Sequence, residues 1–297
     1  MSWVKKLTFL SSVLVITAPA FANEGGGGGV AAAAEPLFHL GPLPVTNSMI
    51  TSWVVALLLI LGVRIAIKRP KLIPTRGQAM VESLVQGIYD LIAPIVGKKV
   101  AKPAFPLLVG LFTFILIQNW SGLVPGVGTI YMVDHETGGW MELIRPGNAD
   151  LNGTAALAIV AMAGWAYFIL RYAGPSVIVK DIFGNKADKS EVPSVIYYPL
   201  FLIFFLVGLI EIVSIVFRPI SLSLRLFGNV FGGESLIHAM SSMQKWGLPM
   251  PFYFLELLIG FVQAFVFTLL ISVYIGLLCN HGDDHDHEHA GHKEAAH

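Results

Sequence analysis

Arg225 is the residue of this chain whose position most demands a chemical reason. It lies in the segment Ser221–Asn229, inside an apolar stretch long enough to lie within a membrane. A guanidinium keeps its proton in proteins, and a charge at the centre of a bilayer costs about 2.5–3.5 kcal/mol on insertion scales. An arginine placed at such a cost is expected to act on ions rather than to fill space.

Further polar residues lie at helical spacings around Arg225 and on the next apolar segment. At about 100° and 1.5 Å per residue, Asn229 lies one turn beyond Arg225, whereas Glu234 lies about 13 Å away on nearly the opposite face. Glu211 lies about 21 Å before Arg225 along a continuous helix. A fixed cation among intramembrane carboxylates predicts a path for ions. The candidate residues are Arg225, Glu211, Asn229, Glu234, Glu256, Gln263 and His238.

The last apolar segment adds a second polar line. Glu256 and Gln263 are seven residues apart and therefore share one face of a helix. If an antiparallel hairpin turns around residues 245–251, Glu234 and Glu256 lie at similar distances from the turn and could line one water-filled cleft. Gln263 would then reach the depth of Arg225, where its amide could hydrogen-bond the guanidinium. Glu211, on the other side of Arg225, would line a second cleft.

Composition places the chain among membrane proteins. Of its 297 residues 55% are hydrophobic and only 13% are charged, and the mean hydropathy is +0.71, which excludes an ordinary soluble domain. The 19 basic and 19 acidic residues balance, which argues against a nucleic-acid partner. A single cysteine excludes an internal disulfide. The predicted fold class is an all-α polytopic membrane protein.

Five apolar segments are long enough to cross a membrane. The fourth is too long for one upright span, so it must tilt strongly, bend or break near Pro219. Residues 77–97 are apolar with helical period between polar positions, which predicts an amphipathic helix at the interface; a helix in a soluble loop is the alternative. We therefore expect about five membrane-embedded helices plus an interfacial one, the last two spans forming a long tilted hairpin. The five segments are 48–67, 104–125, 151–171, 194–245 and 250–280.

The N-terminal part is predicted to be exported. Residues 1–22 read as a signal peptide, because a pair of lysines precedes a short apolar run and Ala20–Ala22 offers a small-residue cleavage site. An uncleaved signal anchor is the alternative. Residues 23–47, with their glycine tract, would form an exported flexible segment ahead of the membrane domain, residues 48–280.

Positive charge predicts the orientation of the spans. Basic residues gather in the segments 64–102 and 171–192, whereas 126–150 holds one arginine among four acids. The positive-inside rule places the first two segments in the cytoplasm and the third outside. Five crossings then begin outside and end inside, so the C-terminus is expected in the cytoplasm.

The C-terminal tail, residues 281–297, supports a competing hypothesis. It holds six of the nine histidines together with several carboxylates, a composition that can capture zinc, nickel or copper. A divalent-metal membrane transporter (zinc or nickel) is therefore the second hypothesis. Such a protein would need ligands inside its spans, where only His238 is available. A solvated cytoplasmic tail is the simpler interpretation.

Three motifs carry a family resemblance. The segment Arg218–Glu234, with the sequence RPISLSLRLFGNVFGGE, closely resembles the signature of subunit a of F-type ATP synthases. The segment Gln263–Phe267 resembles the final-helix motif of that family, and Pro125–Gly128 fits the loop after an earlier span. The resemblance covers most of residues 48–280. One departure concerns positions 234 and 256, which are both glutamate here, whereas some family members have a histidine in this pair; the nearby His238 could supply an imidazole.

The resemblance implies a role and a set of partners. The chain would be the stator ion-channel subunit of the Fo sector in the bacterial inner membrane, with Arg225 facing a rotating ring of c subunits. Two half-channels would pass protons to and from the carboxylates of the ring and so couple ion flow to ATP synthesis. Partners would be the c ring, b subunits and the F1 sector, in contact with membrane lipid. No cofactor and no catalytic residue is expected, because the chain lacks a Gly-x-x-x-x-Gly-Lys-[Ser/Thr] nucleotide motif. The residues that match half-channel or arginine-neighbour positions are Glu211, Asn229, Glu234, Glu256 and Gln263.

Overall fold

A computed structural model describes most of the predicted membrane domain. The described residues are 34, 36–40, 43–67, 73–124, 131–133, 140–142, 144–174, 194–243, 247 and 249–294. The predicted signal peptide and the Pro125–Gly128 loop lie outside them. The backbone of the last helix continues through much of the histidine-rich tail, but the tail side chains also lie outside the described part.

Six helices in the described residues are long and apolar enough to cross a membrane, which confirms the helical membrane fold. The sequence predicts five such spans and an interfacial helix, whereas the helix expected at the interface also qualifies by its length and composition. The difference in number comes from this one element. The helices are α2 (Asn47–Ala66), α3 (Arg76–Val96), α4 (Lys98–Ser121), α5 (Leu151–Phe168), α7 (Ser194–Met243) and α8 (Met250–Glu294).

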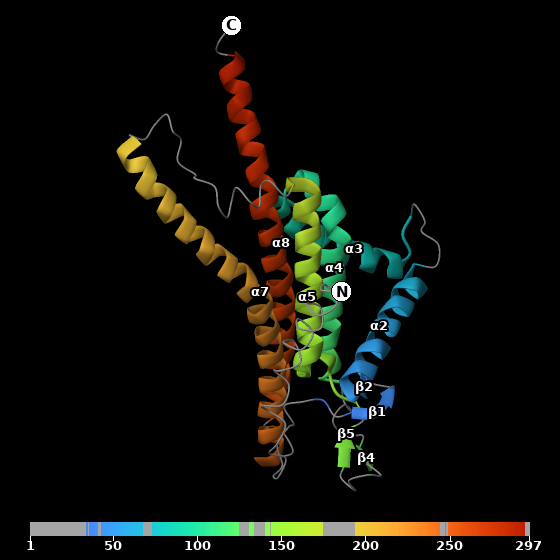
Figure 1. Ribbon diagram of the computed structural model, residues 1–297. Helices are drawn as coiled ribbons and strands as arrows, with labels where there is room; N and C mark the ends of the chain where they lie inside the picture. Colours follow the sequence, from blue (N-terminus) through green and yellow to red (C-terminus); the bar gives the residue numbers. More distant parts are fainter. Residues whose placement is uncertain are drawn as a thin grey trace.

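The core lies where α4, α5, α7 and α8 meet. Figure 1 shows α4, α5 and α8 standing side by side, with the second half of α7 along them and α2 on the opposite flank. Apolar side chains from these helices are removed from the surface, and a π-helical turn, η3 (Ile169–Ala173), extends α5 within the same cluster. Aliphatic and aromatic packing therefore positions the polar residues. Fully buried members of the core are Leu108, Ile115, Ala161, Leu226, Ile271 and Ile275.

Glycines make the close turns and contacts between helices. Gly97, between α3 and α4, has φ 90°, a left-handed conformation that a residue without Cβ adopts at no steric cost. Two adjoining helices can therefore follow each other with one residue between them. On α8, a Cβ at Gly276 would collide with the backbone carbonyl of Ile95, so α8 and the end of α3 approach at backbone distance.

α7 is one continuous helix of 50 residues that changes direction along its length. Figure 1 shows its first part diverging from the bundle and its second part running beside α8. Pro219 lies inside α7, where its ring removes one backbone hydrogen bond and clashes with the carbonyl four residues earlier. Among the three possibilities that the sequence leaves open at this position, the helix bends and does not break.

Short strands gather at the end of the bundle where α2, α5 and α8 begin (Figure 1). Strands β1 (Pro36–Leu40) and β2 (Leu43–Thr46) pair antiparallel, as do β4 (Tyr131–Val133) and β5 (Trp140–Glu142). A 3₁₀ turn, η2 (Gly147–Ala149), leads into α5. The expected flexible segment before α2 thus contains a hairpin in its last residues.

Candidate functional site

Arg225 projects from the outward side of α7. The residues that surround it in sequence alternate between a buried side, which includes Leu222 and Leu226, and an exposed side. Arg225 is exposed and, within the described residues, forms no hydrogen bond or ion pair. The protein therefore presents an uncompensated cation on a membrane-spanning helix. We call its surroundings the Arg225 face, made of the exposed residues Ser221, Arg225, Gly228, Asn229 and Gly232.

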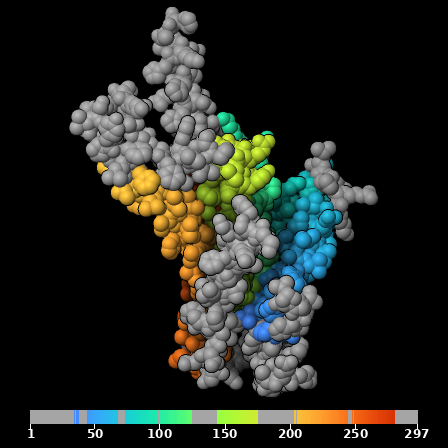
Figure 2. Space-filling view, viewed as in Figure 1, coloured from blue at the N-terminus to red at the C-terminus, as the bar shows by residue number. Residues whose placement is uncertain are grey.

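The Arg225 face offers open space beside the cation. A Cβ placed at Gly228 or Gly232 would meet no heavy atom of the described residues within 4 Å. These glycines follow Arg225 by three and seven residues, so they share its side of the helix. Figure 2 shows α7 along one flank of the molecule, in gold and orange. Small residues on such a flank allow another helix to approach closely.

Asn229 links the Arg225 face to α8. Its Nδ2 donates to Oε1 of Gln263 over 2.7 Å. Gln263 is 5% exposed, and its Nε2 has no hydrogen-bond partner among the residues that the structure describes. The sequence suggested that this amide could bond the guanidinium of Arg225, whereas the structure gives its carbonyl to Asn229, one turn further along. The polar line of α8 therefore reaches the arginine through Asn229.

Glu256 of α8 lies against the backbone of α7. A Cβ at Gly233 would collide with the carboxylate of Glu256, so the acid occupies the space that the glycine leaves. The next residue of α7 is Glu234, and both glutamates are half-buried. The structure thus brings these two acids to the same level of the α7–α8 contact, as the hairpin argument predicts. His238, one turn beyond, is exposed and makes no hydrogen bond or ion pair in the described part of the chain.

Glu211 forms an ion pair that the sequence analysis did not predict. Its Oε1 accepts a hydrogen bond from Nη2 of Arg218 over 2.6 Å. The two residues are seven apart, which places them on one side of α7 two turns from each other. That spacing was visible in the sequence, because Arg218 begins the motif itself. The side chain of Arg218 is 12% exposed and that of Glu211 is 37% exposed.

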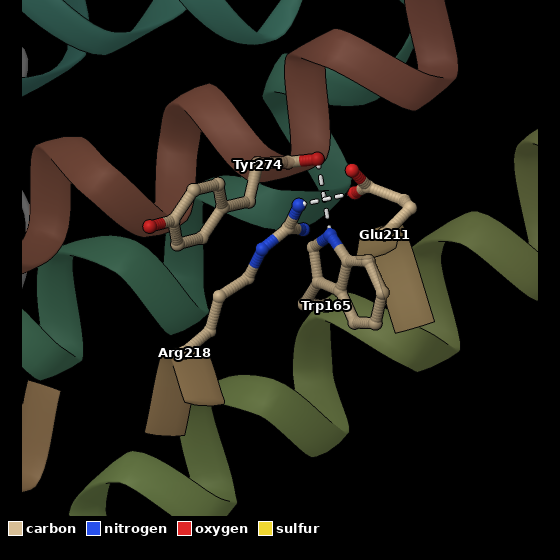
Figure 3. Close-up of polar contacts among 4 residues, drawn as sticks. All are labelled: Trp165, Glu211, Arg218 and Tyr274. Atoms are coloured by element: carbon tan, nitrogen blue, oxygen red, sulfur yellow. Dashed lines mark hydrogen bonds and ion pairs between the residues drawn. The ribbon is translucent and has the colours of Figure 1, made fainter. Parts of the chain in front are cut away.

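Two aromatic side chains hold the same guanidinium. Figure 3 shows Arg218 between Tyr274 of α8 and Trp165 of α5. The Cζ atom of Arg218 lies 4.5 Å from the centroid of the tyrosine ring and 5.8 Å from that of the tryptophan ring, both within cation–π range. The indole Nε1 of Trp165 donates to the backbone carbonyl of Tyr274 over 3.0 Å. Three helices therefore fix the position of this arginine.

A buried polar cluster lies near the strands and was also missed. Asp150 begins α5, accepts a hydrogen bond from the backbone of Asn152 and accepts another from Oγ of Ser48 at 3.0 Å. Asn119 donates to the carbonyl of Gly260 over 2.9 Å. These contacts join α2, α4, α5 and α8. The signal for them is polar residues inside or beside apolar runs, but it does not identify partners more than 100 residues apart.

The site therefore arranges charge at three levels along α7. Glu234 and Glu256 lie near the α7–α8 turn, Arg225 lies further along α7, and the Glu211–Arg218 pair lies beyond it. An unpaired guanidinium can stabilise a carboxylate that approaches from outside the chain. Within the described residues, no group of three or more His, Cys, Asp or Glu side chains is placed to hold a metal ion.

Comparisons with known proteins agree with the motifs. A family model described as ATP synthase A chain matches residues 49–276. The chain is 33% identical over 239 residues to the ATP synthase subunit a of Moorella thermoacetica, covering 80% of this chain and 93% of that protein. It is 32% identical over 240 residues to ATP synthase subunit a 2 of Bradyrhizobium sp., covering 81% and 92%. Both relatives and the family model are named as the a subunit, or A chain, of ATP synthase. This chain therefore belongs to the ATP synthase subunit a family.

Proposed function

We propose that this chain is the ion-translocating stator subunit of an Fo sector, with Arg225 directed at the rotor. The observation that carries the proposal is the exposed and unpaired state of Arg225 on an apolar helix. Lipid is an unfavourable neighbour for a guanidinium. An acidic partner within the membrane would remove that cost, and the two glycines of the Arg225 face leave room for its helix.

The proposed mechanism follows from the charge of a rotor carboxylate. Such a group must be neutral while it faces lipid, because its ionised form is expensive there. Beside Arg225 the ionised form is favoured, so the proton leaves on one side of the arginine and another is taken up on the other side. The guanidinium also repels protons, which prevents direct leakage between the two sides. A membrane potential supplies about 2.3 kcal/mol per charge per 100 mV.

Two half-channels would carry the protons. Glu234 and Glu256 would line the path from the exported side, with Gln263 and Asn229 beside its inner end and His238 as a further candidate. Glu211 would stand on the cytoplasmic path. This assignment is supported by the contact of Glu256 with the backbone next to Glu234 and by the separation of both from Glu211 along α7.

The c ring, b subunits and the F1 sector would be the partners, and ATP would be made by those partners rather than by this chain. The chain would be a multi-pass protein of the bacterial inner membrane with its N-terminus outside. Its two basic segments, 64–102 and 171–192, support that orientation through the positive-inside rule.

Disulfide crosslinking in assembled membranes tests whether the Arg225 face meets the rotor. Cys279 is the only cysteine of the chain, so a Cys279→Ser background removes competing thiols. With Gly232→Cys added, and a cysteine next to the rotor carboxylate, we expect an oxidised product of a plus c mass. Gly62→Cys on α2, which also has open space at its Cβ, is the matched control and should give none. Equal crosslinking at both positions, or none at Gly232→Cys, contradicts the proposal.

A further inference from the structure

α7 carries two intramembrane arginines in different states. Arg218 and Arg225 are seven residues apart on α7, on either side of Pro219. Arg225 is exposed and unpaired within the described residues, whereas Arg218 is 12% exposed and paired with Glu211. The two arginines therefore differ in their contacts: Arg218 has a carboxylate and two aromatic rings beside it.

Several contacts hold the side chain of Arg218 in place. Its guanidinium has a carboxylate at 2.6 Å and the tyrosine ring centroid of α8 at 4.5 Å. The neighbouring tryptophan of α5 is itself fixed, since its indole nitrogen bonds the carbonyl of Tyr274. Figure 3 shows the four side chains converging from three helices. The partner acid, Glu211, is 37% exposed, so it lies at the edge of this arrangement.

An unpaired guanidinium at this position would oppose proton movement. The proposed function places a water-filled path beside Glu211, on the cytoplasmic side of Arg225. A second fixed positive charge there would lower the local proton concentration, and fields of this kind change rates by about ten-fold or more. A carboxylate in direct contact cancels most of that field at a distance.

We infer that Glu211 is the fixed counter-charge of Arg218 and helps to hold its guanidinium in position. Glu211 is not a proton carrier. This inference rests on the proposed function. The pair makes Arg218 electrically silent, so that Arg225 remains the uncompensated cation of the site. Glu211 is then needed because Arg218 is present.

ATP-driven proton pumping in membrane vesicles tests the inference through a pair of variants. Glu211→Gln leaves Arg218, still held between the two aromatic rings, without its carboxylate. We expect proton pumping to fall about tenfold. In Glu211→Gln/Arg218→Gln both charges are gone, and we expect most of the lost rate to return. If Glu211 carries protons, the double variant stays as slow as the single one, and the inference is overturned.

Three controls keep the outcome interpretable. The amount of assembled complex is determined for each variant, because an arginine left without its carboxylate in a partly buried place can prevent assembly. Glu211→Asp/Arg218→Lys keeps both charges and is expected to pump faster than Glu211→Gln; an equally slow rate contradicts the inference. Arg225→Ala in the same membranes separates the two proposals. Normal pumping by Arg225→Ala rejects the stator function, whereas an inactive Arg225→Ala with a slow double variant rejects only the role given to Glu211.

Discussion

Asn229 donates a 2.7 Å hydrogen bond from Nδ2 to Oε1 of Gln263 and so joins α7 to α8 one turn from Arg225. Gln263 is buried, whereas Asn229 belongs to the exposed Arg225 face. The bond therefore fixes the rotation of α7 about its own axis at the level of the arginine. The outward direction of Arg225 depends on a specific polar contact as well as on apolar packing.

Removing both partners of this bond is expected to cost less than the two single removals added together. Asn229→Leu leaves the carbonyl of Gln263 buried without its donor, at a cost of about 1–3 kcal/mol, and should lower coupled ATP synthesis. Asn229→Leu/Gln263→Leu replaces both groups and should cost less than the sum of the single changes. Thermal stability of the purified complex and synthesis rates measure this. Strictly additive losses would show that the two side chains act separately.

Gly233→Ala should disturb the acid of α8 directly. Its Cβ would occupy the position of the Glu256 carboxylate, which must then move away from α7. We expect a severalfold loss of ATP-driven proton pumping with the complex still assembled. The matched control is Gly62→Ala on α2, where a Cβ meets nothing within 4 Å and pumping should be unchanged. Full pumping by Gly233→Ala would remove Glu256 from the proposed path.

A large side chain at Gly232 should obstruct the rotor without harming the fold of the chain. No described residue occupies the space beside Gly232, so Gly232→Leu should be accommodated in the isolated subunit. If the rotor passes there, ATP synthesis and ATP-driven pumping should both fall about tenfold or more, because the close approach of helices depends on small residues. Gly62→Leu, at an equally open glycine, should keep both activities. Equal behaviour of the two variants would place the rotor elsewhere.

Asp150 should contribute to stability rather than to transport. It is 3% exposed, caps the start of α5 and accepts a hydrogen bond from Ser48. Loss of a helix cap costs about 0.5–2 kcal/mol, and the Ser48 hydroxyl would in addition lose its acceptor. Asp150→Ala should therefore lower the Tm of the purified complex, and Asp150→Asn, which keeps an acceptor oxygen, should lower it less. An unchanged Tm for Asp150→Ala would show that this cluster adds nothing to folding.

The sequence predicted those features that depend on period and hydropathy. The five long spans could be read from apolar length, and the shared face of Arg225 and Asn229 follows from the geometry of one helix. That Glu234 and Glu256 lie at the same level of the α7–α8 contact required only the assumption of a hairpin. A helix was expected at 77–97, at the membrane interface. The helix Arg76–Val96 is also long and apolar enough to cross a membrane, so its pattern alone does not separate an interfacial helix from a span.

Contacts between distant segments were beyond such arguments. Arg218 shares a side of α7 with Glu211 by simple spacing, yet nothing in the sequence shows that Trp165 and Tyr274 meet it there. The choice of Asn229 over Arg225 as the partner of Gln263 depends on how α7 is rotated against α8. The position of the Glu256 carboxylate against Gly233 likewise depends on the distance between the backbones of α7 and α8. Each of these results from packing among helices rather than from the pattern along one.

The measurement that tests the account most directly is ATP synthesis driven by a proton gradient, together with passive proton conductance, in membranes carrying Arg225→Ala. With normal amounts of assembled complex, the account predicts that coupled synthesis is lost and that passive conductance rises, because the uncompensated cation is both the partner of the rotor acid and the barrier between the half-channels. Arg225→Lys keeps a charge and should leak less than Arg225→Ala. Synthesis at the normal rate in Arg225→Ala membranes would contradict the central claim.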